Sequence, residues 1–219
     1  PVLFWLWFWL REDQNKPEPL YLIIITFIAG MAVVPAAIPL QQLACQLSGI
    51  GQCQPANQNL VVTWVIIEES LKYAAALIVI LWNKAVDEPI DYVIYLITIA
   101  LGFSALENAL FLFNPLTGGD LVTTLLTGKF RFLGATLLHV ISSAAIGVAL
   151  AFAYHRTPTT KLLFGMVGLC SAVALHALFN FLIIGSSGET ILAVFALVWF
   201  GVIALFFAFE KLKRTSHPR

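Results

Sequence analysis

The feature that most constrains this chain is a series of apolar stretches, each long enough to cross a lipid bilayer. A transmembrane α-helix needs about 20 mostly apolar residues. Such stretches occupy residues 20–43, 60–82, 90–113, 130–154, 161–184 and 190–210. With 60% hydrophobic and 11% charged residues, the composition excludes an ordinary soluble globular protein. We therefore predict an all-α fold, a polytopic transmembrane helix bundle with six complete spans.

The N-terminal apolar stretch is shorter than the others. Val2–Leu10 is too short to cross a bilayer, and the small-residue cleavage site of a signal peptide is missing before Arg11. We interpret this stretch as the end of a truncated N-terminal span. No internal repeat or long linker divides the chain, so residues 1–219 are expected to form a single transmembrane domain.

Basic residues fall mostly on one side of the predicted bundle. If the spans alternate in direction, one side carries Arg11, Lys16, Lys84, Arg156, Lys161, Lys211, Lys213, Arg214 and Arg219. Only Lys129 and Arg131 fall on the other side, where Arg131 is expected either to reach the headgroups or to meet an acid such as Asp120. The positive-inside rule then places the C-terminus in the cytoplasm. The net charge of zero gives no indication of nucleic-acid binding.

Two outward-facing connections and one span carry distinctive residues. The first connection contains Cys45 and Cys53, for which a disulfide and two free thiols are both open. The longest connection, Asn114–Gly128, is polar and contains glycine, so it is either a mobile lid over the outer face or a plain loop. Within the first span, Pro35 and Pro39 each remove a backbone donor, which predicts a bend or a break.

Six charged or histidine residues lie well inside the predicted spans, away from the span ends, where a charged side chain costs roughly 2.5 to 3.5 kcal/mol. They are Glu68, Glu69, Lys72, Glu107, His139 and His176. At about 1.5 Å per residue from the outer helix ends, the two histidines, Glu68 and Glu107 share a layer roughly 9 to 14 Å deep. Because four different helices reach this layer, we expect the side chains to converge on one cavity nearer the outer face.

Helical spacing groups these residues further. Lys72 follows Glu68 by four residues and Glu69 by three, so its ammonium group can reach either carboxylate. A structural ion pair that fixes helix packing is the alternative interpretation. His176 and Asn180 are four residues apart and therefore project together.

Carboxylates, imidazoles and amides in a confined pocket suit hydrolysis at a carbonyl group. A carboxylate can take a proton from water, and a histidine or asparagine donor can stabilise the resulting oxyanion. Alternatively, two histidines and a glutamate, here His139, His176 and Glu107, are the usual ligand set of catalytic zinc. An ion- or proton-coupled transporter would use the same groups as a relay. The spacing of the residues leaves these alternatives open.

Four short motifs resemble those of one protein family. Glu68–Lys72 resembles the EExxK motif of the PrsW family of intramembrane proteases, and Gly102–Asn108 is similar to that family's second motif. His139 falls where a later histidine of the family is expected. His176–Asn180 resembles the HxxxN motif that the family shares with the CAAX prenyl protease superfamily. The motifs occur in the family's order within a core of about residues 60–184.

The resemblance implies hydrolysis of a peptide bond in a membrane-anchored regulatory protein, such as an anti-sigma factor, within or beside a bacterial plasma membrane. The roles assigned on this basis are water activation by Glu68 or Glu69, tuning of that pair by Lys72, water orientation or zinc binding by His139 and His176, a second acid or ligand in Glu107, and oxyanion stabilisation by Asn180. Asn108 would support the site or simply join two helices.

Overall fold

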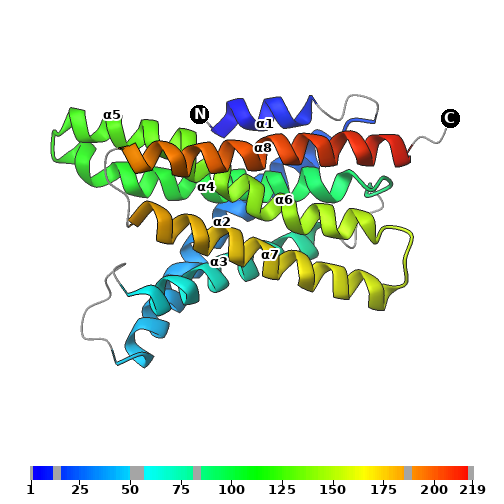
Figure 1. Ribbon diagram of the computed structural model, residues 1–219, viewed down its shortest axis with the longest axis horizontal. Coiled ribbons are helices and arrows are strands. Elements are labelled where there is room, and N and C mark those ends of the chain that lie inside the picture. The colour runs from blue at the N-terminus through cyan, green and yellow to red at the C-terminus, as the bar shows by residue number, and fades with distance from the viewer. Residues whose placement is uncertain (1, 12–15, 50–56, 81–84, 185–188, 217–219) are drawn as a thin grey trace.

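The chain folds into a bundle in which most helices lie along one long axis, while the helices at residues 20–47 and 58–80 run obliquely to it (Figure 1). The computed structural model describes residues 2–11, 16–49, 57–80, 85–184 and 189–216. Within these ranges no strand occurs, and the elements are α1 (Val2–Leu10), α2 (Leu20–Leu47), α3 (Gln58–Ile80), α4 (Asp91–Thr117), α5 (Leu121–Phe130), the π-helical turn η1 (Arg131–Ala135), α6 (Thr136–Phe152), α7 (Pro158–Ile184) and α8 (Glu189–Ser216). The prediction of an all-helical fold is confirmed.

Five segments of the described chain are long and apolar enough to cross a membrane. They are α2, α4, the continuous stretch from α5 through η1 to α6, α7, and residues Thr190–Leu212 of α8. The expected span at 60–82 is the 23-residue helix α3, but its three ionisable residues keep it outside this set. The class of transmembrane bundle therefore stands, while the count of six spans, the truncated seventh and the single domain remain predictions.

The prediction of a loop over Asn114–Gly128 is wrong. Helix α4 continues to Thr117 and α5 begins at Leu121, so only three residues connect them. The side chain of Asp120 caps α5 by accepting a hydrogen bond from the backbone N–H of Thr123 at 3.0 Å. Threonine hydroxyls made this segment look polar, but Thr124 and others bond to carbonyl groups one helical turn earlier. Such residues are therefore compatible with a helix here.

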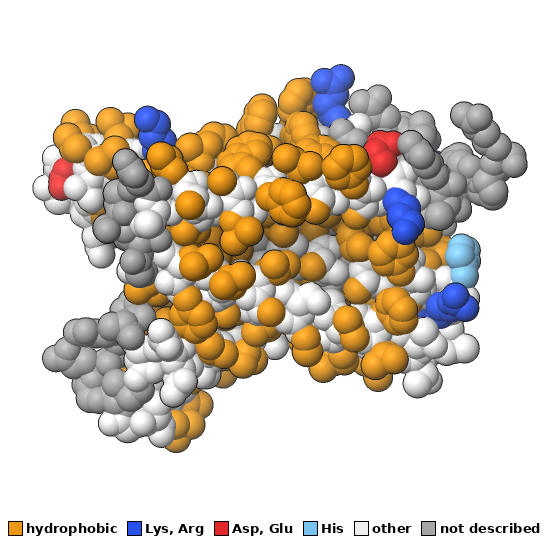
Figure 2. Space-filling view, viewed as in Figure 1, with side chains coloured by type: hydrophobic (Ala, Val, Ile, Leu, Met, Phe, Trp, Pro, Cys, Tyr) orange, Lys and Arg blue, Asp and Glu red, His pale blue; other side chains and the backbone are white. Residues whose placement is uncertain are grey.

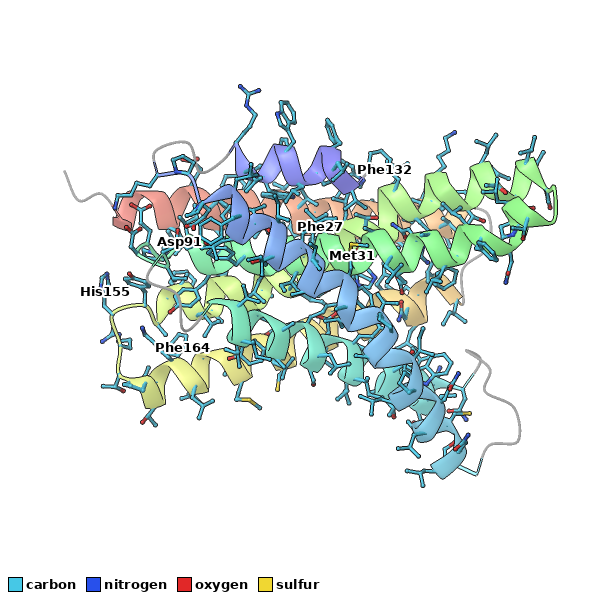
Figure 3. The ribbon with its side chains drawn as sticks, turned by 180° about the vertical axis from the view of Figure 1, so that it is seen from behind. Phe27, Met31, Asp91, Phe132, His155 and Phe164 are labelled. Carbon is cyan, nitrogen blue, oxygen red and sulfur yellow. The ribbon has the colours of Figure 1, made fainter. Side chains whose placement is uncertain are left out.

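Helix α2 continues without a break through Pro35 and Pro39, so the expected break is wrong, while the alternative of a bend remains a prediction. Its close packing against α4 depends on two glycines. A Cβ atom at Gly30 would lie 2.2 Å from the carbonyl oxygen of Ile99, and one at Gly102 would lie 2.0 Å from that of Phe27. Figure 3 shows Phe27 on α2 at this crossing. Gly102, the first residue of the second family motif, therefore serves helix packing.

Helix α4 lies at the centre of the bundle and packs against α1, α2, α3 and α6. All its residues from Asp91 to Ser104 are buried, which explains why this segment is apolar on every side. On the face seen in Figure 2, apolar side chains extend along the length of the bundle, and most of the charged side chains lie toward the two ends of the long axis. This distribution suits a molecule surrounded by lipid.

The cysteines are only partly described. Cys45 is buried near the end of α2 and is disulfide-bonded, but Cys53 lies outside the described residues. Cys170 is free and exposed on α7.

Candidate active site

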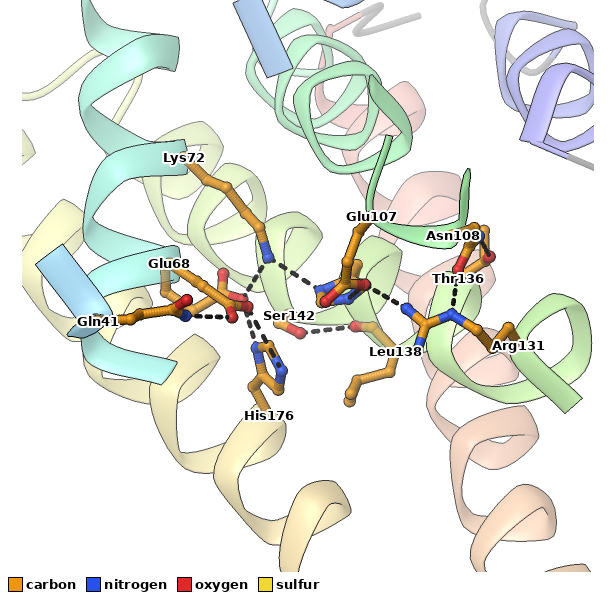
Figure 4. Close-up of polar contacts among 12 residues, drawn as sticks. Gln41, Glu68, Lys72, Glu107, Asn108, Arg131, Thr136, Leu138, Ser142 and His176 are labelled. Carbon is orange, nitrogen blue, oxygen red and sulfur yellow. Dashed lines mark hydrogen bonds and ion pairs between the residues drawn. The ribbon is translucent and has the colours of Figure 1, made fainter. Parts of the chain in front are cut away.

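The ionisable residues of four helices meet in the interior of the bundle (Figure 4). Helix α3 supplies Glu68, Glu69 and Lys72, and the other three helices supply one residue each, namely Glu107 from α4, His139 from α6 and His176 from α7. The two imidazole rings lie edge to face with centroids 4.8 Å apart. The depth and spacing of these side chains along their helices predicted that they converge, and they lie together in the structure.

Glu69 and Lys72 form a fully buried ion pair. Nζ of Lys72 lies 2.8 Å from Oε1 of Glu69, and both side chains are 0% exposed. Nδ1 of His176 lies 2.7 Å from the same oxygen. The ammonium group also lies 4.0 Å from the centre of the Phe103 ring, a cation–π contact that strengthens when desolvated. Of the two carboxylates within reach of Lys72 along α3, it is Glu69 that takes the hydrogen bond.

His139 contacts a different partner through each ring nitrogen. Nδ1 lies 2.9 Å from Nζ of Lys72, and Nε2 lies 3.1 Å from Oε2 of Glu107. Because an ammonium group can only donate, Nδ1 accepts from Lys72. The proton of the neutral ring is therefore assigned to Nε2, where it is donated to Glu107. Lys72 thus connects the Glu69–His176 pair to the His139–Glu107 pair.

Glu68 is held on one side only. Its Oε1 accepts a hydrogen bond of 2.9 Å from Nε2 of Gln41 on α2. Its Oε2 is buried, has no hydrogen-bond partner among the described residues, and lies 3.9 Å from Nε2 of His176. Glu68, His176, Asn180 and Glu107 border one cavity of about 460 Å³, whereas Glu69 does not. The sequence could not distinguish the roles of the two glutamates. In the structure, Glu68 borders the cavity, whereas Glu69 is buried and does not.

Arg131 lies beside the site rather than at the headgroups. It meets an acid, as one of the two expectations had it, but this acid is Glu107 and not Asp120. Its guanidinium group pairs with Oε2 of Glu107 and donates to Oδ1 of Asn108. Asn108 in turn donates to Oγ1 of Thr136 at 3.0 Å. Arg131 is the first residue of η1, and single π-helical turns inside α-helices are frequent at functional sites.

Sequence analysis did not connect Gln41 or Arg131 with this cluster. Gln41 lies on α2, which has no acidic residue, basic residue or histidine, so nothing in the sequence linked it to Glu68. Arg131 carried a signal, since it lies eight residues before His139 on the continuous α5–α6 stretch. About two helical turns separate these two residues, and the long side chain of Arg131 reaches Glu107, which His139 also contacts.

Three residues are arranged so that they could bind a metal ion. Glu68, His139 and His176 each offer one ligand atom, and these atoms lie within 4.8 Å of one another. The ligand set expected from the sequence named Glu107 instead of Glu68. Glu107 is engaged by Arg131 and His139, whereas Oε2 of Glu68 has no partner among the described residues. The group that the structure brings together is therefore a different glutamate with the same two histidines.

Buried carboxylates and histidines around a cavity, inside a bundle of membrane-spanning helices, define the class of intramembrane hydrolases. A sequence model described as PrsW family intramembrane metalloprotease matches residues 18–208, and the chain belongs to this family. It is therefore a peptidase and an integral membrane protein of bacteria. The transporter alternative is not favoured.

Proteins named Protease PrsW are similar to the chain over most of its length. The protein from Oceanobacillus iheyensis is 26% identical over 199 residues, which cover 91% of this chain and 85% of the relative. The one from Bacillus subtilis is 23% identical over 221 residues, covering 98% and 91%. No solved structure matches the chain.

Proposed function

We propose that the protein hydrolyses a peptide bond in or beside the membrane-spanning segment of a membrane protein, with Glu68 and His176 at the centre of the reaction. The observation that carries this proposal is the position of Oε2 of Glu68. This oxygen has no hydrogen-bond partner among the described residues and lies 3.9 Å from Nε2 of His176, at the border of the cavity. A water molecule can hydrogen-bond to two polar atoms at this spacing.

In the first form of the proposal, Glu68 is the general base. As the water oxygen attacks the scissile carbonyl carbon, Glu68 takes one proton from the water. Glu68 then passes this proton to the amide nitrogen as the C–N bond breaks, which yields a carboxyl group and an amine. His176, with its proton on Nδ1 toward Glu69, presents the lone pair of Nε2 to the water and orients it. Asn180, one turn after His176, is the proposed donor to the oxyanion.

The remaining residues of the cluster would position these two. Glu69 fixes the ring of His176, and Lys72 balances the charge of Glu69 in the interior. Gln41 holds Oε1 of Glu68 and leaves Oε2 directed to the cavity. Glu107 holds the tautomer of His139 and is itself held by Arg131.

In the second form, Glu68, His139 and His176 hold a divalent metal, for which zinc is the candidate. The donor set fits in kind, because two histidines and one glutamate are common ligands of catalytic zinc. His139 would give up its contact with Lys72 or with Glu107, so that one ring nitrogen has a free lone pair for the metal. A cation would also satisfy the buried oxygen of Glu68 that lacks a partner. The contact of His176 with Glu69 matches the carboxylate support that metal-binding histidines usually have. When bound, the metal would act as a Lewis acid toward the scissile carbonyl group.

Metal analysis of the purified protein separates the two forms. We would measure zinc by mass spectrometry in the native protein and in the His139→Ala, His176→Ala and Glu68→Gln variants. His155→Ala is a matched control, because this histidine is exposed after α6, at the end of the bundle away from α5 (Figure 3). Stoichiometric zinc in the native protein and the control, lost in the three variants, supports the second form. A folded native protein without zinc supports the first.

Proteolysis itself is tested in bacterial cells. New chain termini in the membrane proteome would be labelled and compared between cells expressing the native protein and the Glu68→Gln, His176→Ala and His155→Ala variants. We expect a set of cleaved membrane proteins that disappears with the first two variants and persists with the control. Cleavage that continues at the native rate in Glu68→Gln would contradict the proposal.

We also propose that the cavity lies nearer the outer face of the membrane. The basic residues Lys161 and Lys211 lie near the end of the bundle where α6 finishes, while Phe130 and Ile184 of the cavity lie toward the end that carries α5 (Figure 1). The positive-inside rule places the first of these ends in the cytoplasm. Reporter fusions at the C-terminus would test this orientation.

A further inference from the structure

A second cavity lies beside the candidate active site, between α7 and α8. It has a volume of about 380 Å³ and is lined by residues of α6, α7 and α8. Helix α8 packs along α6 and touches α7 only sparsely, so α6 forms the floor of the opening and the other two helices form its walls. Figures 1 and 2 show this face, with α8, α6 and α7 side by side and mostly apolar side chains along it. We call it the α7–α8 groove.

The lining of the α7–α8 groove is entirely apolar. On α6 it includes Leu138, Ile141, Ala145 and Val148, which follow each other by three, four and three residues and therefore form one face of the helix. This face extends over about 15 Å at 1.5 Å per residue. The groove thus runs parallel to the membrane-spanning helices, and its chemistry suits an apolar occupant.

The α8 wall combines three small residues with bulky ones, namely Leu197, Val198, Phe200 and Leu205. Gly201, Ala204 and Ala208 line the groove, and small residues at such spacings let another helix approach closely within a membrane. A helix in the groove could therefore approach α8 closely at these three positions. The apolar lining of the groove suits a transmembrane helix better than a hydrated, extended peptide.

The groove is continuous with the candidate active site. Leu138 and Phe179 line both cavities. Leu138 directly precedes His139, and Phe179 lies between His176 and Asn180 in the sequence. An apolar helix in the groove would therefore have one end at the residues proposed to act on a peptide bond.

We propose that the α7–α8 groove is the docking site for a transmembrane helix of the substrate, which enters sideways from the lipid. This inference rests on the proposed function, because a peptidase with a membrane-protein substrate must admit a segment that never leaves the bilayer. The end of the bound helix toward α5 would unwind into the cavity beside Glu68 and His176. Residues close to that end of the substrate helix would contain the cleaved bond. Lipid acyl chains are the competing occupant.

Photo-crosslinking tests the docking site without turnover. The Glu68→Gln protein would be placed in nanodiscs with a single-span Leu/Ala-rich peptide of about 23 residues that carries a diazirine side chain at its centre. We expect crosslinks on the groove faces of α6, α7 and α8. The Ala204→Leu change fills the groove from one wall, and Leu178→Trp fills it from the other. Both residues are exposed, so the larger side chains have room without disturbing the core.

Each filling variant should lower the crosslink yield in the groove about tenfold, since overfilling an apolar contact is unfavourable by that order. Ala196→Leu is the matched control, because Ala196 is exposed on α8 but does not line the groove, and it should leave the yield unchanged. Crosslinks spread evenly over the lipid-facing surface, or unaffected by both filling variants, would overturn the proposal and leave lipid as the occupant.

Failure of the docking site and failure of the proposed function give different results. If Ala204→Leu and Leu178→Trp cleave membrane proteins at the native rate while Glu68→Gln does not, the docking site is wrong and the proposed function stands. If Glu68→Gln cleaves normally, the proposed function is wrong whatever the crosslinks show. Thermal unfolding of each variant is measured in detergent. An unfolding temperature equal to that of the native protein establishes that the bundle is intact.

Discussion

Nδ1 of His176 lies 2.7 Å from Oε1 of Glu69, so α7 and α3 are joined in the interior by an imidazole–carboxylate contact. The same oxygen pairs with Lys72, which is 0% exposed. This carboxylate therefore serves two partners, one that balances its charge and one whose ring orientation it fixes. Oε1 of Glu69 therefore contributes both to the stability of the bundle and to the geometry of the proposed site.

We expect Glu69→Gln to destabilise the protein strongly. The amide keeps the size of the side chain but leaves the ammonium group of Lys72 buried without its counter-ion. Removing one partner of a buried ion pair typically costs about 3 to 5 kcal/mol. Thermal unfolding in detergent measures the effect. The double variant Glu69→Gln/Lys72→Met removes both charges and should recover much of the stability, while proteolysis stays lost because His176 lacks its carboxylate. An unfolding temperature equal to the native one for Glu69→Gln would show that the pair is not structural.

A second prediction concerns Gln41 on the neighbouring helix, whose Nε2 donates a hydrogen bond of 2.9 Å to Oε1 of Glu68. In Gln41→Ala this oxygen loses its partner, and Glu68 is free to rotate away from His176. A hydrogen bond to a charged group is worth roughly 1.5 to 3 kcal/mol, so we expect cleavage to slow by about tenfold or more. Stability should change little, since Gln41 is partly exposed. Gln42→Ala, at the exposed neighbouring position, is the control. Equal rates for the two variants would remove Gln41 from the site.

Much of this arrangement was predictable from the sequence, for a clear physical reason. The rise of a helix and the length of each apolar stretch fix the depth of a side chain, so Glu107 and His139 could be assigned to one layer before their contacts were known. The rotation of each helix about its axis is set by packing against its neighbours. Spacing could not decide whether Lys72 pairs with Glu68 or Glu69, and it could not bring Gln41 to the site.

The helical hairpin of α4 and α5 shows the other limit. Thr117, Thr123 and Thr124 lower the apolar character of this segment, and the sequence therefore favoured a loop. In the structure, their hydroxyl groups bond to carbonyl oxygens of the preceding turn or to Asp120. Local hydrogen bonding of this kind satisfies the polar groups without leaving the helix. Composition alone does not distinguish a threonine that ends a helix from one that continues it.

The cap of α5 gives a prediction for pH. Hydrogen bonds from Thr123 lower the pKa of Asp120, which lies in the turn between α4 and α5. Because the pKa is depressed in the folded hairpin, the ionised carboxylate stabilises the turn above the ordinary aspartate pKa of about 3.9. This contribution is lost as the pH falls through the lower pKa of the folded state.

Hydrogen exchange at the amides of Thr123 and Thr124 measures the effect. Protection relative to the intrinsic exchange rate should fall in the acid range for the native protein. The Asp120→Asn variant retains an acceptor for the cap but does not titrate, so its protection should be independent of pH over that range. Parallel pH profiles for the two proteins would rule out Asp120 as the titrating group.

Arg131 connects the π-helical turn to the cluster, because it pairs with Glu107 and donates to Asn108 at the same time. We expect Arg131→Ala to free the side chain of Glu107, so that the proton of the neutral His139 ring is no longer held on Nε2. A lysine has a single ammonium group and cannot reproduce the planar fork of the guanidinium, so Arg131→Lys should restore only part of the lost activity. The nitrogen NMR signals of His139 report the tautomer directly, and a purely structural role for Arg131 would leave them unchanged. Lys129→Ala, at an exposed position on α5, should alter neither the signals nor the cleavage rate. If Arg131→Ala shifts the unfolding temperature but not the His139 signals, Arg131 stabilises the bundle and does not position the site.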